Sequence, residues 1–312
     1  MIQFSKTLQT LNQIEGSTLL SMDYNDDYKF DEFLKVGAAS DQDVKNFVEN
    51  HLFGGKRMDC SLPNMACSTF LAPVQDVGFV FGRNLDQIEC RQLLLKTAPQ
   101  NGYESISVVS LSYLGLPPNG PLFTEDNKHF ILSAPYVSLD GVNSCGLAIG
   151  ILKIPQASTC QRRGKICLTS TTAIRLVLDK CATVDEAVSM LSEYDMNASA
   201  NTDFHFHIVD RTGHSVVVEY VENEMKVIES GFATNFLLTP GVEVGHGHDR
   251  YEKMVNTVSE NPDGFADMNE PMKLLSDVSA NSTRWSSVYD LKNCSLLLSV
   301  NRDYENLYTF KL

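Results

Sequence analysis

The spacing of the apolar residues changes along the chain, and this change is the strongest constraint on its fold. From residue 67 onward, short apolar runs rich in β-branched and aromatic residues are separated by Gly, Pro, Asn or Asp, which is typical of strands. Between residues 171 and 194 the spacing lengthens to three or four, which predicts two consecutive helices. Strand-like runs then return, and two further helical stretches precede a final hairpin.

The predicted elements are grouped by type rather than alternating one by one. Helices are expected at Thr171–Cys181, Val184–Tyr194, 249–259 and 268–278. Strands are expected at 67–73, 78–84, 105–113, 129–137, 146–153, 203–209, 215–221, 224–229, 232–238, 284–290 and 294–300. This order excludes a strict βαβ succession and predicts an α+β fold, in which two antiparallel sheets lie between helices.

Residues 1–66 have a different pattern from the rest of the chain. The sequence after Ser40 predicts a capped amphipathic helix that ends at Gly54-Gly55, and Pro63 interrupts the segment after it. We therefore expect a helical appendage, joined through an irregular strap at Lys56–Ala66 to a single domain at 67–312.

Composition excludes several classes of partner. The formal charge is -14, so neither a nucleic acid backbone nor an anionic membrane surface would be attracted to the protein. Residues 1–20 hold no secretory apolar run, and no stretch of about 18 uncharged apolar residues is present. We expect a cytoplasmic protein with no membrane anchor that acts on small molecules, and a homo-oligomer is compatible with the sequence.

Cysteine and histidine spacing does not favour a metal site. The eight cysteines form no CxxC pair. Histidines 205, 207, 246 and 248 are close in sequence, but no cysteine or carboxylate stands at a matching ligand spacing, so we interpret them as structural or surface residues. The sequence predicts no metal and no cofactor.

One predicted hairpin carries residues suited to nucleophilic chemistry. Cys67-Ser68-Thr69-Phe70 precedes a turn, and Gly82-Arg83-Asn84-Leu85-Asp86 follows it, so Cys67, Arg83 and Asp86 should meet at one end of a sheet. A thiol with a pKa of roughly 8.5 needs a base or a positive charge to become a nucleophile. If the bond before Cys67 were cut, its own α-amino group could be that base. Arg83 would favour the thiolate, and Asp86 would hold the amine.

These motifs resemble the choloylglycine hydrolase and penicillin V acylase family of N-terminal-nucleophile (Ntn) hydrolases. The resemblance covers about residues 67–312 and rests on the Cys-Ser-Thr and Gly-Arg-Asn-Leu-Asp motifs together with Asp140–Asn143, Gly146-Leu147, His205–Asp210, Ser215–Glu219, Phe232–Asn235, Asp249–Tyr251 and Thr283–Asp290. It implies a four-layer αββα sandwich. By this resemblance Cys67 is the nucleophile and, through its amine, the base, with Arg83 and Asp86 beside it. Asn235 would donate a hydrogen bond to the oxyanion, and Arg250 would support the site.

Two departures from the family pattern bear on function. Counting forward from Gly146 reaches Leu152-Lys153 where many relatives have a second asparagine, so a second oxyanion donor is unassigned. The 66-residue leader is similar to the long propeptides of acid ceramidase-like and acyltransferase relatives, and bile salts are therefore not expected to be the substrate.

The resulting hypothesis is a precursor that cuts itself before Cys67 and then hydrolyses a linear C–N amide bond of an N-acyl small molecule through an acyl-enzyme. One alternative is an acyltransferase that passes the acyl group to an amine. Another is a non-catalytic relative that acts as a binding module. An ordinary cysteine protease with a Cys–His pair would leave the Gly-Arg-Asn-Leu-Asp motif unexplained.

Overall fold

The computed structural model describes residues 5–57, 65–119, 121–124, 126–156 and 159–312. Its helices are α1 (Lys6–Thr10), α2 (Phe30–Val36), α3 (Asp41–His51), α4 (Ser170–Lys180), α5 (Val184–Ser192), α6 (His248–Ser259) and α7 (Asn269–Asp277), with 3₁₀ helices η2 (Leu111–Leu114) and η3 (Lys128–Val137). Within the described ranges, none of these helices combines the length and apolar character needed to cross a bilayer.

The strands form two large sheets and two small ones. The nine-stranded sheet has the order β1 (Asn12–Gln13), β2 (Leu20–Tyr24), β5 (Gln92–Thr97), β6 (Ser105–Ser110), β7 (Asp140–Asn143), β8 (Ala148–Ile154), β11 (Asp203–Val209), β12 (Ser215–Val221) and β13 (Glu224–Glu229). The six-stranded sheet has the order β14 (Phe232–Ala233), β3 (Met65–Val74), β4 (Gly78–Gln87), β17 (Thr283–Asp290), β18 (Ser295–Val300) and β19 (Tyr308–Lys311). The two-stranded sheets pair β9 (Cys167–Thr169) with β10 (Asp195–Asn197), and β15 (Asn235–Phe236) with β16 (Gly245–His246).

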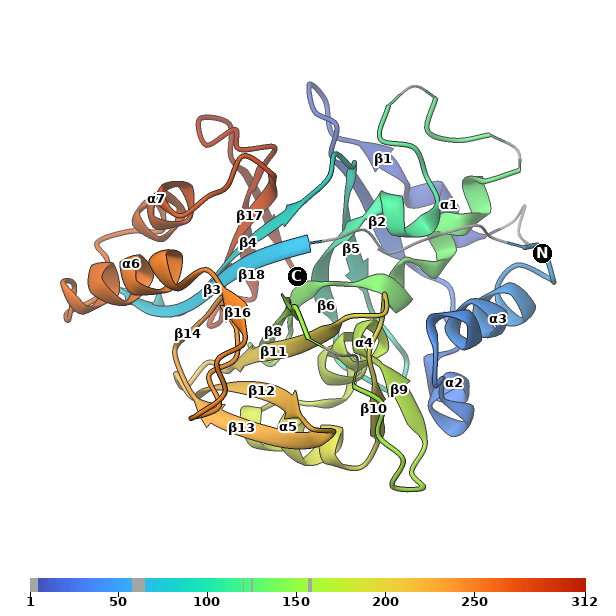
Figure 1. Ribbon diagram of the computed structural model, residues 1–312. Helices are drawn as coiled ribbons and strands as arrows, with labels where there is room; N and C mark the ends of the chain where they lie inside the picture. The colour runs from blue at the N-terminus through green and yellow to red at the C-terminus, as the bar shows by residue number, and fades with distance from the viewer. Residues whose placement is uncertain (1–4, 58–64, 120, 125, 157–158) are drawn as a thin grey trace.

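The layers follow the predicted sandwich. Helices α4 and α5 pack on the nine-stranded sheet, α6 and α7 pack on the six-stranded sheet, and the two sheets meet where β3 faces β8. Figure 1 shows α6 and α7 at one side of the molecule and the leader helices α2 and α3 at the opposite side. The pairings within the two large sheets are antiparallel except for that of β2 with β5. The predicted fold class, α+β with an αββα arrangement, is therefore confirmed.

The hairpin of β3 and β4 forms where the sequence predicted it. Its turn at residues 75–78 has Asp76 and Gly78 at positive φ (60° and 109°), which glycine adopts freely and aspartate tolerates better than most residues. Ten pairs align the two strands, including Ala66 with Asp86, Cys67 with Leu85 and Thr69 with Arg83. The strand begins at Met65, so its first two residues belong to the segment that we expected to be an irregular strap.

Some predicted elements are wrong. Residues 129–137 form the 3₁₀ helix η3 rather than a strand, because Pro135 has no N–H for a sheet ladder and its φ is fixed. The strand predicted at 105–113 ends at Ser110 and continues as η2. The strand predicted at 232–238 is divided between β14 and β15, which belong to different sheets. Asp140–Asn143, for which no element was predicted, is strand β7.

The leader is more than the helical appendage that the sequence suggested. Helix α3 is present, and the Ser40 hydroxyl caps it by accepting a hydrogen bond from the Asp43 amide. However, β2 pairs in parallel with β5 over five residues, so the leader adds two strands to the nine-stranded sheet. Cys60 and Pro63 lie outside the described residues.

Candidate active site

The β3–β4 hairpin and two other elements bring the five predicted site residues together. Cys67 lies on β3, and Arg83 and Asp86 lie on β4. Asn235 lies on β15, and Arg250 lies in the first turn of α6. Hydrogen bonds or ion pairs link all five, although Asn235 and Arg250 are far from Cys67 in sequence.

The Cys67 thiol is fully buried and lies beside a guanidinium group. Arg83 Nη2 donates to Sγ at 3.5 Å. Burial raises the pKa of the Cys67 thiol to about 11, while Arg83 acts in the opposite direction. At neutral pH the thiol is therefore protonated, and it needs a base before it can act as a nucleophile.

Arg83 is held on its other sides by the nine-stranded sheet. Its Nη1 donates to the Ile151 carbonyl at 2.7 Å, and its Nε lies 2.6 Å from Asp140 Oδ2. A Cβ at Gly150 would come within 2.8 Å of Nη1, so glycine at this position leaves room for the guanidinium. A buried charge needs a partner of opposite sign, and Asp140 provides it.

Asp140 is a site residue that the sequence analysis did not identify. Besides Arg83, its carboxylate accepts a hydrogen bond from Trp285 Nε1 at 2.9 Å and another from the Tyr289 hydroxyl at 2.5 Å. These contacts fix the side of Arg83 that faces away from Cys67. In the sequence, Asp140 belongs to the Asp140–Asn143 motif of the family resemblance, and nothing local connects it to Arg83.

Arg250 contacts more of the site than its predicted supporting role implied. Its Nη1 donates to the Cys67 carbonyl at 2.9 Å and to the Ser68 hydroxyl at 2.6 Å, and lies 3.4 Å from Asp86 Oδ2. Its Nη2 donates to Asn235 Oδ1 at 2.9 Å. Gly247, which precedes α6 with φ +95°, allows this approach, since a Cβ there would lie 2.8 Å from Nη2.

The oxygen of the Asn235 side chain, rather than its amino group, contacts Cys67. Oδ1 accepts from the Cys67 backbone N–H at 2.9 Å, and Nδ2 donates to the Lys153 carbonyl at 2.9 Å. These partners fix the orientation, because the reversed amide would place its oxygen against a carbonyl and its amino group against two donors. The predicted donation to an oxyanion is not among the contacts of Asn235 in the structure and stays a prediction.

Asp86 has partners other than the amine that we predicted for it. Its Oδ1 accepts from the Thr283 hydroxyl at 2.5 Å, and its Oδ2 faces Arg250. Burial raises the pKa of this carboxyl in spite of these contacts. Since the Cys67 nitrogen is still part of a peptide bond, its contact with Asp86 also stays a prediction.

Strand β8, which carries Leu152-Lys153, supplies two backbone hydrogen-bond acceptors to the site. The carbonyls of Ile151 and Lys153 on β8 accept from Arg83 and Asn235 respectively. This strand therefore orients two site residues through its backbone. It leaves the second oxyanion donor unassigned.

The two histidines of β11 make hydrogen-bond contacts within the described chain. His205 contacts Glu219 and the Thr234 carbonyl, and His207 lies between the hydroxyls of Thr69 and Ser215. Within the described residues, no group of three or more His, Cys, Asp and Glu side chains is arranged to hold a metal ion.

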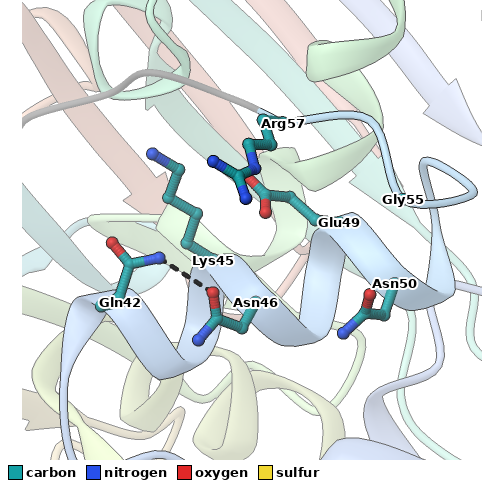
Figure 2. A pocket seen from close by; sticks show the side chains of 7 residues that line it. All are labelled: Gln42, Lys45, Asn46, Glu49, Asn50, Gly55 and Arg57. Atoms are coloured by element: carbon teal, nitrogen blue, oxygen red, sulfur yellow. Dashed lines mark hydrogen bonds between the residues drawn. The ribbon is translucent and has the colours of Figure 1, made fainter.

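A hollow of about 490 Å³ lies on the leader, not at the thiol. It is lined by Gln42, Lys45, Asn46, Glu49, Asn50, Gly55 and Arg57. Figure 2 shows the side chains of Glu49 and Arg57 close together above α3, while Gln42 donates to Asn46 at 2.9 Å. The lining is polar and includes none of the five site residues, so the hollow is not part of the candidate active site.

Solved structures with the same architecture show which fold the chain has. A mutant of conjugated bile acid hydrolase from Clostridium perfringens matches with a TM-score of 0.58 and 17% identity, over 79% of this chain and 92% of that chain. Penicillin V acylase from Agrobacterium tumefaciens matches with a TM-score of 0.56 and 18% identity, over 79% of this chain and 86% of that chain. The chain therefore has the fold of the Ntn hydrolases.

A protein-family model also matches the chain and shows its family. The model described as acyl-coenzyme A:6-aminopenicillanic acid acyl-transferase matches residues 122–295, which is more than half of the chain. The chain belongs to this family, as the resemblance to Ntn hydrolases of the choloylglycine hydrolase and penicillin V acylase type predicted. The matched range contains Asn235 and Arg250 and begins after the β3–β4 hairpin. No curated protein sequence gives a significant match.

Proposed function

We propose that the chain is the precursor of an N-terminal-nucleophile amidohydrolase that cleaves its own bond between Ala66 and Cys67. One observation carries this proposal: Arg83, Asn235 and Arg250 hold three different atoms of Cys67, namely Sγ, N and O. An inert buried cysteine needs no such set of charged and amide partners. One arginine thus contacts the Cys67 thiol and a second contacts its carbonyl.

Self-cleavage would begin with the Cys67 thiol attacking the Ala66 carbonyl carbon. The thiol proton goes to the Cys67 nitrogen as the C–N bond breaks, which leaves a thioester between Ala66 and Sγ. Water then hydrolyses the thioester and releases the Ala66 carboxylate, the thiol and a free α-amino group. This amine, with a pKa of about 7.7–8.0, supplies the base that the buried thiol lacks before cleavage.

Turnover would repeat the same chemistry on an external substrate. The thiolate attacks the carbonyl of an N-acyl amide, the amine product leaves with a proton, and water hydrolyses the acyl-enzyme. The proposed partner is a small N-acyl compound, and the steps described require no cofactor. We place the boundary between the propeptide and the catalytic domain at residues 66 and 67.

Acyl transfer is the second candidate, and the description of the matching family favours it. The site residues would be the same, but an amine would accept the acyl group in place of water. Assays with and without added amine distinguish the two, because transfer gives a new amide and hydrolysis gives the free acid. A purified protein that keeps its 66–67 bond intact and turns over no amide would support the binding module instead.

We predict that the active preparation contains a chain that begins at Cys67. Cleavage at this bond leaves 312 - 66 = 246 residues in the large product. Intact mass and N-terminal sequencing measure this directly. An active preparation with any other N-terminus would contradict the assignment of Cys67 as the nucleophile.

We also predict that the leader stays bound after cleavage. Strand β2 is paired with β5 over five residues, and the Tyr28 hydroxyl donates to Asp179 at 2.8 Å in a buried site. Phe33 and Phe47 pack against Tyr136. Size-exclusion chromatography of the cleaved protein should therefore give both fragments in one peak, and denaturant should separate them. Elution of the leader alone from native protein would contradict this prediction.

A further inference from the structure

His205 and Glu219 form a buried hydrogen-bonded pair that has no role in the chemistry proposed above. They lie on the neighbouring antiparallel strands β11 and β12, and both side chains are fully buried. His205 Nδ1 is 3.0 Å from Glu219 Oε1. Burying two polar side chains of this kind costs desolvation free energy, which hydrogen bonds must offset. The partners in those hydrogen bonds are therefore the groups that the pair holds in place.

Glu219 is surrounded by hydrogen-bond donors. Oε1 accepts from the Leu238 N–H at 2.7 Å, and Oε2 accepts from the Thr239 N–H at 3.0 Å and from the Thr239 hydroxyl at 2.7 Å. Burial alone would raise the pKa of the Glu219 carboxyl. The hydrogen bonds from His205, Leu238 and Thr239 outweigh this effect, so the pKa is lowered. The side chain is therefore an ionised carboxylate.

His205 has a partner at each of its two ring nitrogens. Nε2 lies 2.7 Å from the Thr234 carbonyl, which can only accept, so Nε2 carries a hydrogen. Nδ1 faces the carboxylate of Glu219 at 3.0 Å. Both ring nitrogens of His205 therefore face hydrogen-bond acceptors, one on Glu219 and one on Thr234.

The pair holds one short segment of the chain, residues 234–239. His205 binds the carbonyl of Thr234, and Glu219 binds three donors of Leu238 and Thr239. Asn235 lies inside this segment. Sheet pairing supports it weakly, because β14 before it and β15 within it each make only two residue pairs.

We propose that the hydrogen-bonded pair of His205 and Glu219 positions Asn235 against the backbone nitrogen of Cys67. This inference rests on the proposed function. The four hydrogen bonds between the pair and the chain lie on both sides of Asn235 in sequence. The Asn235 side chain must contact Cys67, Arg250 and the Lys153 carbonyl at the same time. Loss of the pair releases the segment, and a misplacement of about 1 Å at a reacting group lowers rates by up to roughly 10²-fold.

The experiment replaces Glu219 with glutamine, which keeps the shape of the side chain but removes its charge and turns one oxygen into a donor. Glu219→Gln should slow precursor cleavage and lower kcat on an N-acyl amide by roughly 10- to 100-fold, with a smaller change in KM. Asp210→Asn is the matched control. Asp210 lies in the turn of the same hairpin and binds the Val184 and Thr212 N–H groups and the Thr212 hydroxyl, but nothing in the 234–239 segment. An equal effect of both substitutions overturns the proposal.

A double-mutant cycle separates positioning from general stability. If Glu219 acts through Asn235, Glu219→Gln adds no further loss to the cleavage rate of Asn235→Ala. Losses that multiply would show that the pair acts independently of Asn235, and would overturn the proposal. If Glu219→Gln does not fold, Thr239→Val replaces it, since it removes only the hydroxyl bond to Oε2. Thr239→Val should slow cleavage about fivefold, which is the effect expected from the loss of one ordinary hydrogen bond. An unchanged rate counts against the proposal.

Amide hydrogen exchange distinguishes failure of this inference from failure of the proposed function. A wild-type protein that neither cleaves itself nor hydrolyses an N-acyl amide refutes the proposed function alone. The positioning role is then judged by exchange at residues 235–239, which Glu219→Gln should accelerate and Asp210→Asn should leave unchanged. Unaltered exchange in Glu219→Gln overturns it.

Discussion

Replacing Cys67 with alanine is expected to abolish both precursor cleavage and substrate turnover. The proposed mechanism forms its two thioesters on the same sulfur, and this is the sulfur to which Arg83 donates. Cys67→Ala should therefore remain at full precursor mass and give no acid from an N-acyl amide. Intact mass over several days and a product assay measure both effects.

Cys60→Ala is the control for this experiment. Cys60 lies seven residues before Cys67 and outside the described residues, and its distance in sequence from Arg83 does not fit the motif. We expect this variant to cleave and turn over normally. If Cys60→Ala were inactive while Cys67→Ala were processed, the nucleophile would be misassigned.

Asn235→Ala is expected to lower kcat by roughly 10²–10³, the effect of losing one oxyanion donor in other hydrolases. Once Cys67 carries a free amine, Nδ2 of Asn235 would contact the carbonyl oxygen of the substrate as negative charge develops on it. Because this contact forms in the transition state, KM should change much less than kcat. Precursor cleavage should slow as well. Steady-state kinetics on an N-acyl amino acid or a phenoxyacetyl amide, with a time course of precursor loss, tests both.

Asn235→Asp separates donation from positioning. The aspartate keeps an oxygen for the Cys67 N–H and for Arg250, but it loses the amino group that now donates to Lys153. If donation to the oxyanion matters, the aspartate variant should be as slow as the alanine variant. If Asn235 only holds Cys67 and Arg250, the aspartate variant should be faster than the alanine variant, although its second oxygen faces the Lys153 carbonyl. An unchanged kcat in Asn235→Ala would remove this residue from the mechanism.

The site could be predicted from sequence where its signals were local. Cys67, Arg83 and Asp86 lie on one hairpin, whose turn and strand period are visible without any knowledge of the fold. Asn235 and Arg250 were reached only through a family resemblance, because nothing local connects them to Cys67. Asp140 was missed because its role depends on Trp285 and Tyr289, which are more than 140 residues away.

The errors in the fold have a similar cause. The apolar run at 129–137 resembles a buried strand, and only Pro135 argued against a ladder there. Strand β2 and strand β5 are parallel neighbours, and they lie about 70 residues apart in the chain, so no hairpin joins them. A parallel pairing leaves no turn between its strands, so no short-range pattern indicates it.

The contact between Trp285 and Asp140 gives the protein an optical reporter. Trp285 is the single tryptophan of the chain, it is fully buried, and its indole N–H is bonded to the carboxylate that holds Arg83. Its fluorescence therefore comes from one position, two side chains away from the Cys67 sulfur. A change in emission during maturation would follow the rearrangement of this network in real time, without a label and without a substrate.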